Sequence, residues 1–233
     1  MEKMQKVKFL IVLSLLAITT VAKSQTSTRL QVGYNMANIS VKNDGTTNDA
    51  NVLSSFNVGI IGSSVLVSPL SLEYGLVLTG KGTKQEIYYT NSTTDFYSKR
   101  TFNPFYLEVP VNLVLKAPIG VSTKLNFYAG PYVAAGLFGK VKGESKFGAL
   151  TTNFSNNIEF NNDNPFTSDQ EDAANSRLRR FDAGLNAGAG IEFSRITLRL
   201  NYGLGLTKLG SAEQNTNDNN KHRVFSLNLG VRL

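Results

Sequence analysis

The sequence has no cysteine, no tryptophan and one histidine, and only 18% of its 233 residues are charged. Without cysteine there is no disulfide, so a fold in an oxidising envelope compartment would have to be stable without one. The charged fraction lies below the roughly 25% that is usual for soluble domains. Asparagine, serine and threonine supply most of the polarity instead. The length suits one domain of the barrel kind.

Long apolar runs are scarce too, and the longest one lies near the N-terminus. It covers residues 9–21, follows three lysines within residues 3–8, and is followed by Ala22-Lys23-Ser24. About 13 residues are too few to cross a bilayer as a helix. A basic start, an apolar centre and small residues at the end are typical of a secretory signal. We predict that residues 1–24 are a signal peptide cleaved after Ser24, and that residues 25–233 form the mature domain.

The remaining chain contains no run of 18 apolar residues. We therefore expect no transmembrane helix, and a membrane crossing would have to use strands. Cleavage after Ser24 would remove four lysines and one glutamate, so the formal charge would fall from +7 to +4. These positive charges are spread along the chain without a basic tract that could contact successive phosphates. We therefore predict that the protein does not bind nucleic acid.

The mature region repeats a pattern of ten to twelve residues in which apolar and polar side chains alternate. In the clearest case Phe181, Leu185, Ile191 and Phe193 fall on one face, and Asp182 and other polar or glycine residues fall on the opposite face. A period of two is typical of strands, whereas a helix shows a period of three to four. The pattern predicts eight strands, at residues 30–39, 56–67, 70–79, 105–116, 125–137, 181–193, 196–207 and 223–233.

The connections between these segments alternate in length. Connections two, four and six are short, at residues 68–69, 117–124 and 194–195. Connections one, three, five and seven are longer and polar, at about residues 40–55, 80–104, 138–178 and 208–222. This alternation is typical of an outer-membrane barrel with tight periplasmic turns and long outer loops. The predicted fold is all-β: an eight-stranded antiparallel up-and-down transmembrane β-barrel with four long outer loops and periplasmic termini.

Alternation alone does not say which face points outward, because a secreted lipocalin-like barrel would turn its apolar face inward. The polar face here is rich in glycine, including Gly184, Gly188 and Gly190, and carries isolated charges. Such a mixture suits the narrow interior of an eight-stranded barrel. The apolar face carries almost no charge, as contact with lipid requires. We therefore expect the apolar face to contact lipid, with aromatic girdles near the strand ends formed by Tyr74, Phe105, Phe127, Phe193 and Phe225.

Three segments resemble a known family. Residues 106–113 (YLEVPVNL), residues 128–132 (YAGPY) and residues 181–193 (FDAGLNAGAGIEF) are similar to strands of the PorT-like outer-membrane β-barrel proteins of Bacteroidetes. The resemblance covers essentially the whole mature chain in layout, and its specific motifs lie in three strands. It implies an outer-membrane barrel of about eight strands. It also implies a link to protein secretion, which holds for some members of a functionally mixed family, and it supplies no catalytic residue.

A set of charged residues falls on the predicted lumen face. Charges removed from water need partners, so we expect acids and bases to pair inside the barrel, with Arg199 next to Glu192 or Glu108. The simplest interpretation is an ion-paired plug that fills the lumen, and a polar relay in a narrow pore is the alternative. The predicted lumen charge cluster consists of Glu73, Glu108, Asp182, Glu192 and Arg199, with Lys116 and Arg232 as further candidates.

No motif indicates an enzyme, a metal site or a cofactor site. The only histidine, His222, is expected at the outer rim as a solvated residue, and Ser226 lies about 13 Å further along the strand, too far to be activated. Gly188-Ala189-Gly190 lacks the third glycine and the helix of a dinucleotide site. Asp169, Glu171 and Asp172 lack the spacing of an EF-hand. We predict no catalytic residue, no metal and no cofactor.

The outer connections are the expected place of any specificity. Aromatic residues scattered along connections three and five could mark a partner surface or extend the sheet above the membrane, and the second interpretation is favoured. Lysine and arginine residues there are candidates for contacts with lipopolysaccharide phosphates: Lys99, Arg100, Arg177, Arg179 and Arg180. The expected partners are outer-membrane lipid, lipopolysaccharide and another envelope protein. The expected function is a non-enzymatic structural or interaction role, accessory to secretion or assembly. The alternative is a small porin-like channel for solutes.

Overall fold

The computed structural model describes residues 26–43, 46–49, 52–91, 94–148, 150–161, 177–207 and 221–233. The predicted signal peptide at residues 1–24 lies outside the described residues, and so do Asp169, Glu171 and Asp172. No helix in the described part of the chain is long and apolar enough to cross a membrane.

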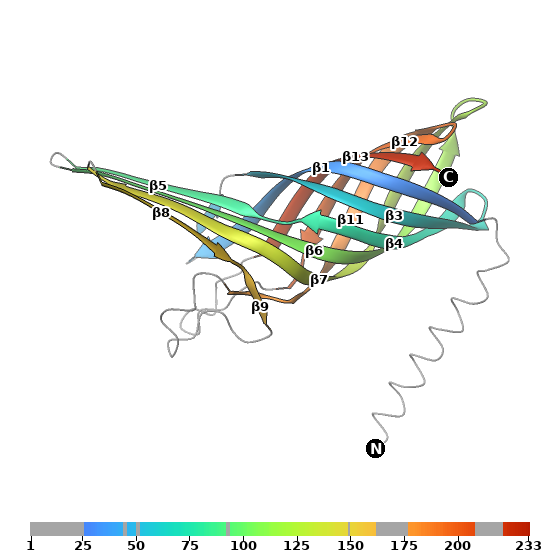
Figure 1. Cartoon of the computed structure of the whole chain (residues 1–233). Coiled ribbons are helices and arrows are strands. Elements are labelled where there is room, and N and C mark those ends of the chain that lie inside the picture. The colour runs from blue at the N-terminus through green and yellow to red at the C-terminus, as the bar shows by residue number, and fades with distance from the viewer. Residues whose placement is uncertain are drawn as a thin grey trace, which may run out of the picture.

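The described residues form a closed ring of eight antiparallel strands (Figure 1). The ring closes because its first strand, residues 26–43, pairs both with residues 53–67 and with the last strand, residues 221–232. Closure leaves no strand edge of the ring exposed to lipid. The prediction of an eight-stranded up-and-down barrel is therefore confirmed. In order around the ring the strands are β1 (Thr26–Asn43), β3 (Leu53–Val67), β4 (Leu70–Gly80), β6 (Thr94–Pro118), β7 (Thr123–Phe147), β11 (Phe181–Phe193), β12 (Ile196–Gly205) and β13 (Lys221–Arg232).

Short turns lie at one end of the barrel and long connections at the other (Figure 1). The turns join β3 to β4, β6 to β7, and β11 to β12, and the last consists of Ser194-Arg195 alone. Ser194 has a φ angle of 52°, in the left-handed region that two-residue hairpin turns use. The C-terminus lies at the same end as the turns. In outer-membrane barrels short turns face the periplasm, so the long connections face outward.

Much of the length predicted as outer loop is strand instead. β6 and β7 are 25 residues long each and continue beyond the ring, where β5 (Thr83–Asn91) pairs with β6 and β8 (Leu150–Asn157) pairs with β7. The result is a projecting four-stranded sheet in the order β5-β6-β7-β8 (Figure 1). We call it the outer sheet. Three short strands complete the set: β2 (Thr46–Asp49), β9 (Glu159–Asn161) and β10 (Arg177–Arg179).

The apolar face of the ring points outward, as predicted. Outward side chains such as Val32 and Leu198 are 55% and 45% exposed, whereas inward side chains such as Asn35 and Thr197 are almost fully buried. Phe127, Phe193 and Tyr74 are exposed near the turn end, and Phe225 is exposed nearer the outer end. Phe105 is buried between the rings of Phe56 and Phe138, at centroid distances of 5.0 and 5.1 Å.

Glycine makes room for the polar side chains that fill the interior. A Cβ on Gly33 would lie 2.0 Å from Asn228 Oδ1 and 2.5 Å from Asn57 Nδ2, so this position on β1 leaves space for two amides from the flanking strands. A Cβ on Gly190 would lie 2.5 Å from Cγ of Arg199. The glycine-rich inner face is thus a steric requirement of the large polar residues beside it.

The apolar core lies at the outer end of the barrel. Phe160 of β9 and Leu178 of β10 pack with Tyr106 and Tyr132, whose side chains face inward. The Tyr106 hydroxyl donates a hydrogen bond to the carbonyl of Arg179 at 3.3 Å, and the rings of Tyr106 and Phe160 meet edge to face. The short β9–β10 pair is therefore held against the outer mouth of the barrel.

Candidate functional site in the barrel lumen

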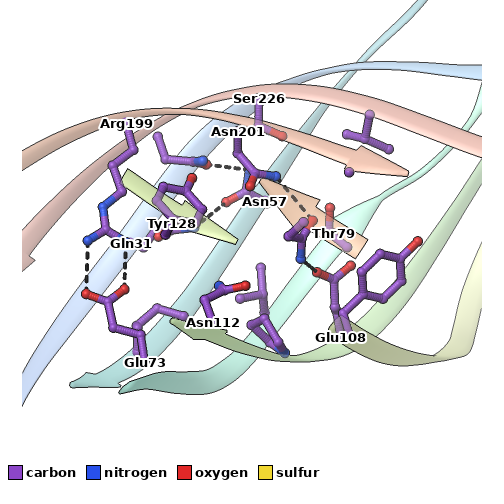
Figure 2. A pocket seen from close by; sticks show the side chains of 18 of the residues that line it. Gln31, Asn57, Glu73, Thr79, Glu108, Asn112, Tyr128, Arg199, Asn201 and Ser226 are labelled. Atoms are coloured by element: carbon purple, nitrogen blue, oxygen red, sulfur yellow. Dashed lines mark hydrogen bonds and ion pairs between the residues drawn. The ribbon is translucent and has the colours of Figure 1, made fainter. Parts of the chain in front are cut away.

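Glu73 on β4 is the centre of the first charge cluster, toward the turn end of the lumen. Arg199 on β12 donates two hydrogen bonds to it, at 2.6 Å to Oε2 and 2.9 Å to Oε1 (Figure 2). Arg29 on β1 donates two longer ones, at 3.2 and 3.4 Å. Glu73 is 1% exposed. Its carboxylate thus accepts from two guanidinium groups, the paired geometry that makes arginine–carboxylate contacts strong.

The Glu73–Arg199 contact spans the barrel. Three strands separate β4 from β12 in either direction around the ring: β6, β7 and β11 on one side, and β3, β1 and β13 on the other. The two side chains therefore come from opposite walls. The Tyr128 ring lies 4.8 Å from the guanidinium carbon of Arg199, in cation–π contact. The Tyr128 hydroxyl donates to the carbonyl of Leu200 at 3.3 Å.

The first cluster continues toward the turns. Lys116 Nζ lies 3.6 Å from Glu192 Oε2 and 4.0 Å from Glu73 Oε1. Arg232 Nη1 lies 3.3 Å from Glu192 Oε1, and its side chain is 42% exposed. The pairs thus become more accessible to water toward the periplasmic end, where each contributes less to stability.

The second charge cluster lies toward the outer end and is centred on Lys81, which directly follows β4. Its ammonium group lies 2.7 Å from Glu108 Oε2 and 3.1 Å from Asp182 Oδ2, and 3.8 Å from the centroid of the Tyr132 ring. Asn186 donates to Glu108 Oε1 at 2.8 Å, and the Tyr132 hydroxyl donates to Asp182 at 3.1 Å. One buried cation therefore joins two carboxylates from different strands.

An amide network fills the space between the two clusters. Asn57 Nδ2 donates to Asn35 Oδ1 at 2.6 Å and to Asn228 Oδ1 at 2.9 Å. Asn35 Nδ2 donates to the Thr79 hydroxyl at 2.9 Å. A cavity of about 60 Å³ is lined by the clusters and this network, which is room for a few water molecules. Figure 2 shows Asn57 and Thr79 of this network between the Glu73–Arg199 pair and Glu108.

The five predicted cluster residues are all buried in the lumen, but one expected pairing was wrong. Arg199 contacts Glu73 rather than Glu192 or Glu108. Glu108 is bound by Lys81, and Glu192 by Lys116 and Arg232. The tilt and stagger of barrel strands bring residues from opposite walls to one level. Proximity in sequence, as between Glu192 and Arg199, is therefore a poor guide to pairing.

Two central cations, Arg29 and Lys81, were missed because each lies just outside a predicted strand. The alternation contained a usable signal for both. Arg29 is two residues before Gln31, and Lys81 is two residues after Thr79, so each continues the inward face of its strand by one more step. Both side chains are below 10% exposed.

His222 does not lie at a solvated rim as predicted. It is 1% exposed, faces inward, and meets the Tyr106 ring edge to face at a centroid distance of 5.3 Å. Within the described ranges, no group of three or more His, Asp or Glu side chains has an arrangement that could hold a metal ion.

The chain is similar to known outer-membrane proteins over most of its length. Residues 24–211 match the family model described as outer membrane protein beta-barrel domain. A search of curated protein sequences gave no match. The solved structures that are similar include Ail, the attachment invasion locus protein of Yersinia pestis, at 16% identity and a TM-score of 0.40, with 89% of this chain and 98% of that chain covered.

Two further solved structures are similar at 12% identity. Neisserial surface protein A is 12% identical with a TM-score of 0.39, and 89% of this chain and 99% of that chain are covered. OprG from Pseudomonas aeruginosa is 12% identical with a TM-score of 0.35, and 90% of this chain and 97% of that chain are covered.

The second charge cluster should depend on Lys81 for its stability. Lys81→Met removes the cation between two buried carboxylates, so we expect the free energy of unfolding to fall by about 3–5 kcal/mol, as for other broken buried pairs. The matched control is Lys146→Met, because Lys146 pairs with Glu144 where both side chains are more than a third exposed. Urea unfolding in lipid vesicles measures both. Equal losses in the free energy of unfolding for the two substitutions would contradict the interpretation that Lys81 is the buried partner of both carboxylates.

Proposed function

Because this chain belongs to the outer membrane protein beta-barrel domain family, we propose that it is a non-enzymatic barrel with a closed lumen and a structural or interaction role. It is an outer-membrane protein, and export after cleavage of residues 1–24 is part of the proposal. The observation that carries it is the Glu73–Arg199 contact between opposite walls. An ion pair that crosses the lumen stabilises the barrel and leaves no open path for solutes.

Three features favour a closed lumen over a channel. The two charge clusters and the amides between them occupy the interior, and the cavity there is about 60 Å³. Eight strands give an interior that side chains can fill, whereas open aqueous pores use about sixteen. The outer mouth is covered by Phe160 and Leu178 against Tyr106 and Tyr132.

Conductance in a planar bilayer separates the closed barrel from the small porin-like channel. We expect no steady open channels from the purified protein, under conditions in which a sixteen-stranded porin conducts. Steady channels that disappear when Arg199→Trp is introduced into the lumen would establish a solute path and reject the closed barrel.

The outer sheet is the surface that we propose for the interaction role. All but one of the residues of β8 are exposed, and its sequence LTTNFSNN has neither charge nor proline. Within the described residues, β8 pairs on one side only. Soluble and membrane proteins usually protect such an edge with charges, proline or a covering segment. An uncharged edge can accept an extended segment of another envelope protein as an added strand. The resemblance to PorT-like barrels favours a partner in secretion or assembly.

Site-specific crosslinking in cells tests this surface. A photoreactive residue at Asn153 or Ser155 on β8 should capture a partner protein, because both side chains are exposed at the sheet edge. The matched control is Val121, an exposed residue in a turn at the opposite end of the barrel. Capture at Val121 but not on β8 would place the interaction surface on the periplasmic side and reject the outer sheet.

A further inference from the structure

A groove of about 600 Å³ lies on the outer wall where the outer sheet leaves the membrane band. Its lower part is apolar, formed by Phe105 of β6 and by Leu137 and Phe138 of β7. Its upper part carries Lys140 and Lys142. The register pairs Phe105 with Phe138, Asn103 with Lys140, and Thr101 with Lys142, so these paired residues share one face.

The apolar part of the groove depends on an irregularity in β7. The β6–β7 register shifts between Phe105 and Tyr106, so β7 contains one extra residue there, Leu137. Leu137 and Phe138 are 53% and 52% exposed although they are consecutive. A bulge of this kind re-aims side chains. Here it turns two neighbouring apolar side chains outward, directly below the lysines.

Neither Lys140 nor Lys142 has a carboxylate partner within the described part of the chain, unlike Lys99 and Lys146 of the same sheet. Lys99 pairs with Glu86 at 3.3 Å, and Lys146 pairs with Glu144 at 3.1 Å. Arg180 donates to the carbonyl of Phe160 at 2.9 Å. Each of these cations thus has a partner within the protein, and the contact of Lys99 and Arg180 with lipopolysaccharide stays a prediction. Lys140 and Lys142 are exposed.

We propose that this groove binds a phosphorylated lipid of the outer leaflet, with its phosphate between the ammonium groups of Lys140 and Lys142. The two Cα atoms lie about 7 Å apart along the strand, so both flexible side chains can reach one phosphate. The acyl chain lies along the exposed side chains of Leu137 and Phe138. Lysines placed just above an apolar band are suited to headgroups at the membrane surface.

The position of the groove favours a lipid over a soluble anion. Its apolar floor continues the lipid-facing surface of the ring, which includes Leu107 and Val133 below it. A soluble anion would contact only the two lysines and leave the apolar floor exposed. A lipid covers both parts at once, and burial of apolar area adds to the charge contact.

Native mass spectrometry of the full barrel in detergent micelles tests the proposal, with bisphosphorylated lipid A as the probe. We expect Lys140→Gln/Lys142→Gln to bind lipid A at least about tenfold more weakly. Lys140→Arg/Lys142→Arg should retain binding, because the positive charges remain. Heat-dependent migration in gels shows whether each variant is folded.

The matched control is Lys221→Gln/Arg223→Gln, which makes the same change of charge on outward positions of β13, away from the groove. It should bind lipid A like the parent protein. Dephosphorylated lipid A should bind weakly, and excess inorganic phosphate should not displace the lipid. The proposal is overturned by equal losses in the two glutamine variants, by unchanged binding in both, by equal binding of dephosphorylated lipid A, or by displacement with inorganic phosphate.

Discussion

The structure depends on one electrostatic constraint: carboxylates enclosed inside the barrel must pair with cations that are enclosed in the same lumen. Glu73 meets this constraint with Arg199 from the opposite strand and Arg29 from the same side of the ring. Lys81 meets it for Glu108 and Asp182. Such pairs offset the cost of removing charge from water only when geometry and hydrogen bonds are good. Glycine on the inner face provides the room for this geometry, as Gly190 does beside Arg199.

Because paired side chains fill the lumen, we expect partners to bind on the outside of the barrel rather than inside it. The lumen is occupied by paired charges and amides, and the aromatic cluster around Tyr106 lies over the outer end. The long strands β6 and β7 leave the ring and carry β5 and β8 with them. The outer sheet presents an uncharged strand edge on β8 and, at its base, two lysines above an apolar groove. We thus propose that the edge of β8 contacts a protein and that the groove at the base of the same sheet contacts a lipid.

The ring itself could be predicted from the sequence because the contrast between an apolar outer face and a polar inner face repeats along every strand. That contrast ends above the membrane, where both faces of a strand meet water or protein. Residues 83–91 and 150–157 therefore looked like loops although they form β5 and β8. Alternation also identified the inward charges, but not which of them meet. The pairing of Glu73 with Arg199 follows from the tilt and stagger of the strands around a closed ring. Neither the tilt nor the stagger can be read from the sequence of a single strand.

The direct contact between Glu73 and Arg199 stabilises the barrel across its diameter. A double-mutant cycle with Glu73→Met, Arg199→Met and the combined variant tests it most directly, with the free energy of unfolding measured in urea and lipid vesicles. We predict that each single substitution is strongly destabilising and that the combined variant loses less than the sum, with a coupling energy of about 2 kcal/mol or more. A coupling energy close to zero would contradict a direct contact between the two side chains.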